Sequence, residues 1–198
     1  GGARLGLKTA LLSRVGDDQI GRFVLETLKA EGVETRGVAT DPERLTAMAF
    51  LGIEDDRNFP LLFVRTDCAD AALCEDDVDP DFIRSAKAIV VSGTHFSKPH
   101  LEAASFKAMR IAKEAGRKII FDIDYRPNLW GLLGAGAGDV RFIADAKVTA
   151  RVQSILPDCD VVVGTDEEVH IAGGSTDTRA ALLNIRKLTK ATIVLKTG

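Results

Sequence analysis

Residues 119–130 have the sequence Ile-Ile-Phe-Asp-Ile-Asp-Tyr-Arg-Pro-Asn-Leu-Trp. The apolar beginning predicts a buried β-strand, which gives way to carboxylates, a guanidinium group and a proline. In an open α/β sheet the ligand crevice lies beyond the carboxyl ends of the strands. Charged side chains at such an end therefore predict a site for an anionic ligand, and Arg126 is its first candidate residue.

Apolar runs alternate with helix-length amphipathic segments on both sides of this stretch. Residues 88–92 predict a strand, residues 98–115 a helix closed by Gly116, and residues 118–123 the next strand. The pattern continues with a helix, a strand, a helix and a strand over residues 145–155, 161–163, 178–189 and 193–196. We therefore predict an α/β fold, a doubly wound and mostly parallel sheet with right-handed crossovers and helices on both faces.

One region departs from this alternation. Residues 47–51 and 61–64 predict two strands around the polar segment 55–58, which is a hairpin signal. We interpret the hairpin as a small β lid, with its strands within about residues 46–66, on a single domain that covers residues 1–198. An apolar face of this lid sheet could pair with a copy of itself, which would give a homodimer.

Composition excludes several classes of partner. The chain has 198 residues, 45% of them hydrophobic, and a net charge of -3, which is ordinary for a globular domain. No apolar run approaches the ~18 residues of a membrane span, and the scattered basic residues give no reason to expect a nucleic-acid partner. The cysteines Cys68, Cys74 and Cys159, in a chain without a signal peptide, indicate free thiols in a reducing cytoplasm, and their spacing does not favour zinc.

The two ends of the chain lead to a further expectation. Residues 1–7 lack an initiator Met, and residues 192–198 predict a buried strand that stops where its loop should begin. We expect the chain to be an internal segment of a larger protein.

Four passages together carry a resemblance to a known family. They are residues 4–23, residues 60–70, residues 92–97, and residues 122–130 with 163–174. With these passages the chain resembles the ribokinase-like, or PfkB-type, carbohydrate kinases, and most closely the members that phosphorylate 5-dehydro-2-deoxy-D-gluconate in inositol breakdown. The resemblance implies transfer of the ATP γ-phosphoryl group to a primary hydroxyl of a sugar acid, with Mg²⁺. Cations aimed at the transferred group would stabilise the transition state.

The resemblance assigns substrate contacts to the lid and to the strand at residues 118–123. Arg65 corresponds to the family's lid arginine, whose planar fork suits a substrate carboxylate, and Phe63 and Val64 are expected to line the same wall. Arg126 matches the arginine of the family's D-x-N-x-R motif and is expected to face both substrate and nucleotide. Asp124 stands where the family has Asn, and we assign it with Arg126 to nucleotide binding. A loop-anchoring Asp-Arg pair is the structural alternative.

The resemblance also implies residues for metal and nucleotide. Residues 165–168 stand where the family has N-x-x-E, so Glu168 is expected to order Mg²⁺ through water, with Thr165 in place of the Asn. Acidic residues are also favoured in any first helical turn, which is the alternative explanation. Lys196, Thr197 and Gly198 resemble the start of the family's adenine-nucleotide loop, where glycine permits close backbone approach.

The segment Gly136-Ala137-Gly138-Asp139 spells the family's catalytic G-A-G-D, but we exclude it as the catalytic motif. The family's motif follows the nucleotide loop and opens a helix, whereas this copy precedes Glu168. We expect no catalytic residue in this chain, with the proton-accepting Asp beyond Gly198, and we expect the chain alone to be inactive. The three histidines, His95, His100 and His170, are expected to be structural, although His95 at a strand's carboxyl end could touch substrate.

Several alternatives remain at this stage. Within the enzyme class they are 2-keto-3-deoxygluconate kinase, fructokinase and ribokinase, and Arg65 favours an acid over a neutral sugar. From another class, the chain could be a non-catalytic domain that binds a sugar acid or a nucleotide. A nicotinamide-dependent oxidoreductase would require a glycine fingerprint after the first strand, and the sequence has none there.

Overall fold

The computed structural model describes residues 1–53, 55, 61–134, 137 and 140–197, and all statements below concern this part of the chain. Its strands are β1 (Ala10–Gly16), β2 (Glu34–Asp41), β3 (Met48–Leu51), β4 (Leu61–Val64), β5 (Ala88–Ser92), β6 (Lys118–Asp122), β7 (Val161–Thr165) and β8 (Thr192–Lys196). Its α-helices are α1 (Gln19–Ala30), α2 (Pro80–Ser85), α3 (Pro99–Glu114), α4 (Ala146–Ile155), α5 (Asp166–Gly173) and α6 (Thr178–Leu188). Short 3-10 helices are η1 (Ala3–Leu5), η2 (Ala69–Ala72), η3 (Glu75–Asp77), η4 (Gly93–Ser97) and η5 (Leu156–Asp158).

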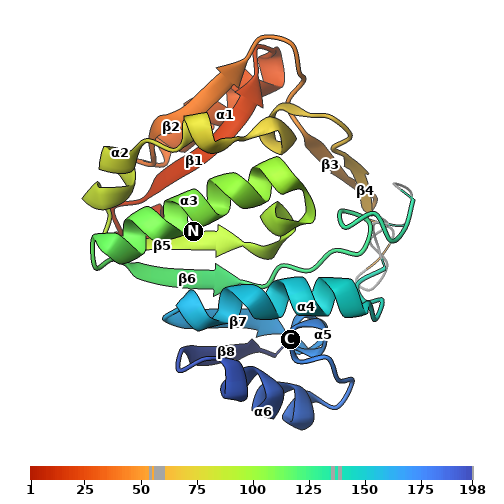
Figure 1. Cartoon of the computed structure of the whole chain (residues 1–198). Helices are drawn as coiled ribbons and strands as arrows, with labels where there is room; N and C mark the ends of the chain where they lie inside the picture. The colour runs from red at the N-terminus through yellow and green to blue at the C-terminus, as the bar shows by residue number, and fades with distance from the viewer. Residues whose placement is uncertain (54, 56–60, 135–136, 138–139, 198) are drawn as a thin grey trace.

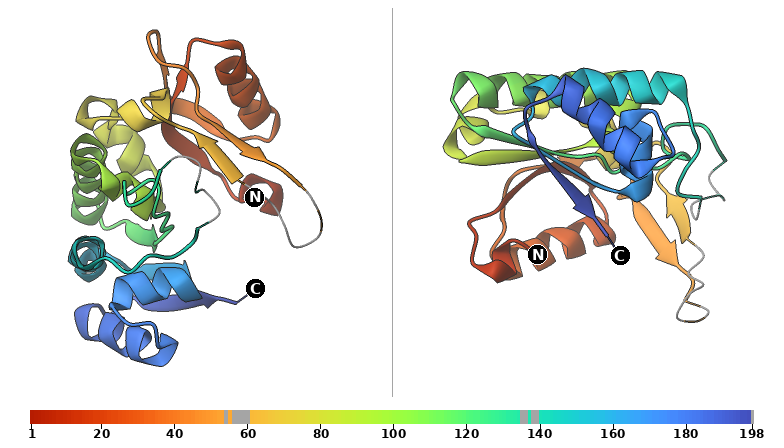
Figure 2. Two further views of the ribbon diagram at one scale, coloured as in Figure 1. Left: turned by 90° about the vertical axis from the view of Figure 1, so that its right-hand side faces the viewer. Right: turned by 90° about the horizontal axis from the view of Figure 1, so that it is seen from below.

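The main sheet is parallel and has the order β5-β6-β7-β8 (Figure 1). Each strand and helix predicted from residue 88 onward is present, with ends that differ by at most two residues. Because the strands follow one another in sequence order, right-handed crossovers keep the connecting helices on one face. Figure 2 shows α3, α4 and α6 on that face and α1, which connects β1 to the parallel strand β2, on the opposite side of the molecule. The molecule as a whole therefore has helices on both sides, while α3, α4 and α6 share one face of the main sheet.

The hydrophobic core lies between the main sheet and these helices. Alternate side chains along β6 and the three residues that follow it are at most 1% exposed. They are Ile119, Phe121, Ile123 and Tyr125. The opposite face of the sheet is more open, since Val90 is 68% exposed. This alternation places the polar residues of the same stretch, from Asp122 onward, on the side away from the core.

The predicted lid hairpin is present as the antiparallel pair β3–β4. Of the polar segment predicted between its strands, residues 56–58 lie outside the described residues. In the register of the pair, Phe63 lies opposite Ala49, and Val64 lies opposite Met48. Consecutive residues of a strand point to opposite faces, so the prediction that Phe63 and Val64 line the same wall is wrong. The face that carries Val64 also exposes the cross-strand pair Phe50 and Leu62.

The three cysteines carry free thiols, as predicted, and Cys68 and Cys159 are buried. Burial raises the pKa of Cys159 to about 12, so this thiol remains protonated at neutral pH. In the ranges that the structure describes, no helix combines the length and the apolar character needed to cross a bilayer.

Candidate functional site

The carboxyl ends of β5 and β6 meet in a cluster of polar side chains. Ser92 Oγ donates a hydrogen bond to Asp124 Oδ2 at 2.7 Å, and Thr94 Oγ1 donates to the same oxygen at 3.3 Å. Ser92 and Thr94 are also within 2.8 Å of each other. Asp124 adopts a φ of +35°, which is unusual for a residue other than glycine. The carboxylate is therefore held toward β5 by two hydroxyl groups.

The end of β4 with the following residues up to Asp70, here called the lid base after the predicted lid hairpin, lies next to this cluster. Arg65, which follows β4, donates from Nε to Asp70 Oδ2 at 2.5 Å. Burial lowers the pKa of His95, and the positive charge of Arg65 lowers it further, while the carboxylates of Asp70 and Asp124 act in the opposite direction. His95 is therefore neutral at pH 7 and lies within electrostatic range of both the lid base and the end of β6.

A second charged group lies on the β7 and β8 side of the same edge. Lys196 Nζ, at the end of β8, is 3.2 Å from Asp122 Oδ1 and 3.5 Å from Glu168 Oε2. Burial by itself lowers the pKa of Lys196, but the carboxylates of Glu168 and Asp122 outweigh burial and raise it. Lys196 is consequently a cation that joins the ends of β6, β7 and β8.

Glu168 has a structural role that the sequence also allowed. It is 4% exposed, and its Oε2 accepts a hydrogen bond from the backbone N–H of Thr165 at 2.7 Å. The Thr165 side chain in turn accepts from the backbone of Glu168, which completes a capping box at the start of α5. Glu168 and Thr165 are thus explained in part by helix capping.

The carboxylate oxygens around Glu168 do not by themselves enclose a Mg²⁺ ion. In the described part of the chain, no group of three or more carboxylate, His or Cys side chains is arranged to enclose a metal ion. Mg²⁺ retains several waters and needs few protein ligands when a nucleotide supplies phosphate oxygens. Asp122 and Glu168 therefore do not form a complete ligand shell, and the role expected for Glu168, ordering Mg²⁺ through water, stays a prediction.

Arg126 leaves β6 four residues after the end of that strand, at the same edge. Among the described residues its guanidinium group makes one weak hydrogen bond, from Nη1 to the carbonyl of Tyr125 at 3.5 Å. No carboxylate of the described residues pairs with it, so the alternative of a loop-anchoring Asp124–Arg126 pair finds no support. Figures 1 and 2 show the hairpin β3–β4 and the segment after β6 on the same side of the molecule. That Arg65 and Arg126 bind the same ligand stays a prediction.

The remaining candidates lie at the ends of this edge. Thr197 directly follows Lys196, and Gly198 lies outside the described residues. Of the excluded G-A-G-D segment, only Ala137 is described. Our sequence reasoning did not assign Asp122, Ser92, Thr94 or Asp70 to the site. Asp122, Ser92 and Thr94 lie at or within two positions of a strand end, which is the signal that could have identified them. Asp70, six positions after β4, carries no such signal.

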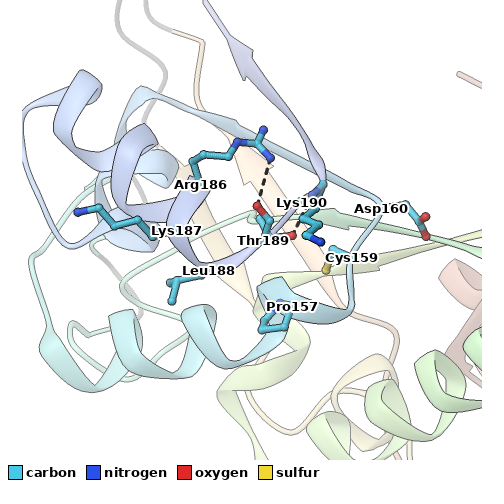
Figure 3. A pocket seen from close by; sticks show the side chains of 9 residues that line it. Pro157, Cys159, Asp160, Arg186, Lys187, Leu188, Thr189 and Lys190 are labelled. Carbon is cyan, nitrogen blue, oxygen red and sulfur yellow. Dashed lines mark hydrogen bonds between the residues drawn. The ribbon is translucent and has the colours of Figure 1, made fainter.

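A pocket of about 540 Å³ lies at the opposite, amino edge of the sheet, where β7 and β8 begin (Figure 3). Its lining includes Cys159, Asp160, Arg186 and Lys190. Arg186 donates to the carbonyl of Thr189 at 3.1 Å, at the end of α6. The carbonyl end of a helix attracts cations, so the basic residues here are explained by helix capping. Ligands of parallel α/β sheets bind at the carboxyl edge, which favours the polar cluster over this pocket.

Comparison with known proteins identifies the class. The model of the pfkB family of carbohydrate kinases matches residues 1–198, and the chain therefore belongs to this family. The fold agrees, since the structure of a PfkB protein from Polaromonas sp. JS666 superposes with a TM-score of 0.83 and 28% identity over 100% of this chain and 63% of that one. A candidate ribokinase II from E. coli, solved in complex with ATP and Mg²⁺, gives a TM-score of 0.80 at 21% identity over 98% and 58% of the two chains, which supports the fold alone.

Curated relatives carry a more particular name. A 5-dehydro-2-deoxygluconokinase of Geobacillus kaustophilus is 37% identical over 170 residues, which are 85% of this chain and 47% of that protein. Another from Halalkalibacterium halodurans is 33% identical and covers 100% of this chain and 57% of the relative. The chain thus spans about half the length of the curated relatives it matches.

Proposed function

We propose that the protein carrying this chain phosphorylates a primary hydroxyl of 5-dehydro-2-deoxy-D-gluconate with ATP. The main support for this proposal is the 33–37% identity to relatives named 5-dehydro-2-deoxygluconokinase. A sugar acid is favoured over a neutral sugar because two arginines, Arg65 and Arg126, lie at the lid base and at the end of β6. Each has N–H groups without a carboxylate partner among the described residues.

Arg65 would bind the substrate carboxylate from the lid side. Its Nε donates to Asp70, which fixes the plane of the guanidinium group, and neither terminal nitrogen has a hydrogen-bond partner among the described residues. One oxygen of Asp70, Oδ1, is buried without a hydrogen-bond partner in the described structure. Phe63, one residue before Val64, faces the side of the hairpin that carries Ala49, so only one of the two can contact the same ligand from β4.

The nucleotide would lie toward β8. Lys196 supplies a positive charge there, with Thr197 and Gly198 as the start of the loop that approaches the nucleotide. Arg126 would neutralise charge on the transferred phosphoryl group, between the substrate side and the nucleotide side. Mg²⁺, when bound with ATP, would offset charge on the phosphate oxygens, and Glu168 and Asp122 would orient the waters around it.

Three further parts of the proposal follow from the sequence predictions. The aspartate that accepts the hydroxyl proton is expected in sequence outside residues 1–198, so the 198-residue chain by itself is expected to be inactive. Pairing of two lid sheets would cover the exposed side chains of Phe50 and Leu62 and give a homodimer. The proposed location is the cytoplasm, in agreement with three free thiols.

A substrate panel tests the proposal. The full-length gene product is assayed for ADP release with 5-dehydro-2-deoxygluconate, 2-keto-3-deoxygluconate, fructose and ribose, each with ATP and Mg²⁺. We expect the highest kcat/KM with 5-dehydro-2-deoxygluconate. A tenfold preference for any other compound would replace the substrate, and binding of a sugar acid without ADP release would favour the non-catalytic alternative.

A further inference from the structure

Two carboxylates leave β6 at the same edge of the sheet, and they have different partners. Asp122 pairs with Lys196, which belongs to β8. Asp124 accepts hydrogen bonds from Ser92 and Thr94, which belong to the end of β5 and to η4. The edge is therefore divided into a β8 side, where the nucleotide is proposed to bind, and a β5 side, which adjoins the lid.

The backbone supports this division. Asp124 has a φ of +35°, in the left-handed region that residues other than glycine adopt uncommonly. Strained conformations of this kind persist only where the surroundings hold them, and they occur preferentially at ligand sites. Here the two hydroxyl groups of the β5 side hold the carboxylate in place.

The turn that carries these groups is fixed against β6. A Cβ atom at Gly93 would lie 2.0 Å from the carbonyl oxygen of Ile123, so only glycine permits this approach. The buried ring of Phe96 packs edge-on against Phe106 and Phe121, with ring centroids 5.2 and 5.9 Å apart. The contacts hold His95, between Gly93 and Phe96, at the same end of β6 as Asp124.

Asp124 retains a free acceptor. Both recorded hydrogen bonds go to Oδ2, and Oδ1 has no partner among the residues that the structure describes. The side chain is half-buried and so remains accessible. A negatively charged acceptor would repel the phosphates of a nucleotide, whereas it forms strong hydrogen bonds with hydroxyl groups.

We propose that Asp124 is a specificity residue for the substrate, which accepts hydrogen bonds from its hydroxyl groups on the β5 side, and that it does not belong to the nucleotide site. The inference rests on the proposed kinase function and deepens it. It also changes the role that the D-x-N-x-R resemblance implies for this position.

The test compares Asp124→Asn with Asp122→Asn in the full-length protein. Asn has the same shape as Asp and tolerates a positive φ, so the substitution removes the charge with little strain. Loss of a hydrogen bond to a charged group, about 1.5–3 kcal/mol, corresponds to a rise of roughly 10–100-fold in KM for the sugar acid. For Asp124→Asn we expect this rise with the KM for ATP changed less than twofold. For Asp122→Asn we expect the reverse, a higher KM for ATP and an unchanged KM for the sugar acid.

A raised KM for ATP or an unchanged KM for the sugar acid in Asp124→Asn would overturn the inference. Calorimetric titration with the sugar acid and with ADP gives the same comparison without turnover. If Asp124→Asn does not fold, Ser92→Ala, which frees the carboxylate, should raise the KM for the sugar acid about threefold and leave ATP unaffected; equal effects on both would contradict the inference. If the wild type phosphorylates fructose instead of a sugar acid, the proposed substrate fails, and the same comparison is made with fructose.

Discussion

The two edges of the main sheet carry similar charged residues with different partners. At the amino edge, Asp160 accepts from the backbone N–H of Ile119, and Arg186 donates to the backbone carbonyl of Thr189. At the carboxyl edge, Asp124 and Lys196 bond only to other side chains in the described structure. Asp160 and Arg186 each satisfy a backbone group and so stabilise the fold, whereas Asp124 and Lys196 are held by side chains that they can exchange for a ligand.

The largest expected effect concerns arginines at the two edges. Arg126→Ala in the full-length protein should lower kcat at least ~100-fold, because a group that stabilises transition-state charge is lost. Steady-state assays of ADP release measure this change. Arg186→Ala is the matched control at the amino edge, and its kcat should stay within twofold of the wild type. Equal turnover in the two variants would remove the functional distinction between the edges.

The lysines offer a second, smaller comparison. Lys196→Met removes the cation between Asp122 and Glu168, and the KM for ATP should rise about tenfold, equivalent to ~1.4 kcal/mol, with the KM for the sugar acid unchanged. Lys190→Met, at the amino edge, should leave both constants unchanged. Coupled assays at varied ATP provide the values. A KM for ATP that is the same in Lys196→Met as in the wild type would place the nucleotide elsewhere.

The smallest effect is expected in stability at the amino edge. Asp160→Ala leaves the N–H of Ile119 unpaired and should reduce the free energy of unfolding by about 1–2 kcal/mol at pH 7, without a change in kcat. Asp158→Ala, which removes an exposed ion pair with Lys113, should lower stability less than Asp160→Ala does. Urea unfolding of both variants measures the difference, and equal losses would show that the backbone contact is unimportant.

The contacts of Asp160 also predict how stability depends on pH. Lys118 and the N–H of Ile119 lower the pKa of Asp160 below its ordinary value. A group whose folded pKa is lowered stabilises the fold above its unfolded pKa, about 4, and this contribution disappears as the pH falls through the folded pKa. The stability gap between wild type and Asp160→Ala should therefore be full at pH 7 and shrink below about pH 4. A gap that stays constant down to pH 2 would contradict this account.

Much of the fold could be predicted because it depends on local periodicity. The apolar run that begins at Ile119 identified β6, while its core face is known only from the burial of alternate side chains in the structure. Asp145 and Gly116 mark a helix start and a helix end as their residue types predict. The error at Phe63 and Val64 had a local cause, since both were assigned to one wall although neighbours in a strand face opposite ways. The predicted α/β fold is present, and within the main sheet the sequential strand order places α3, α4 and α6 on one face.

The sequence by itself determined the α/β class, the position of the lid hairpin, the family resemblance and the charged end of β6, because these follow from residue patterns within short segments. Only the tertiary structure decided which charges meet. Lys196 reaches Asp122 across 74 positions of sequence, and Asp124 turns to Ser92 across 32. Such pairings depend on the order of the strands in the sheet and on the positive φ of Asp124. Neither of these features produces a periodic pattern in the sequence. The division of the sheet edge into two sides is therefore a property of the folded chain.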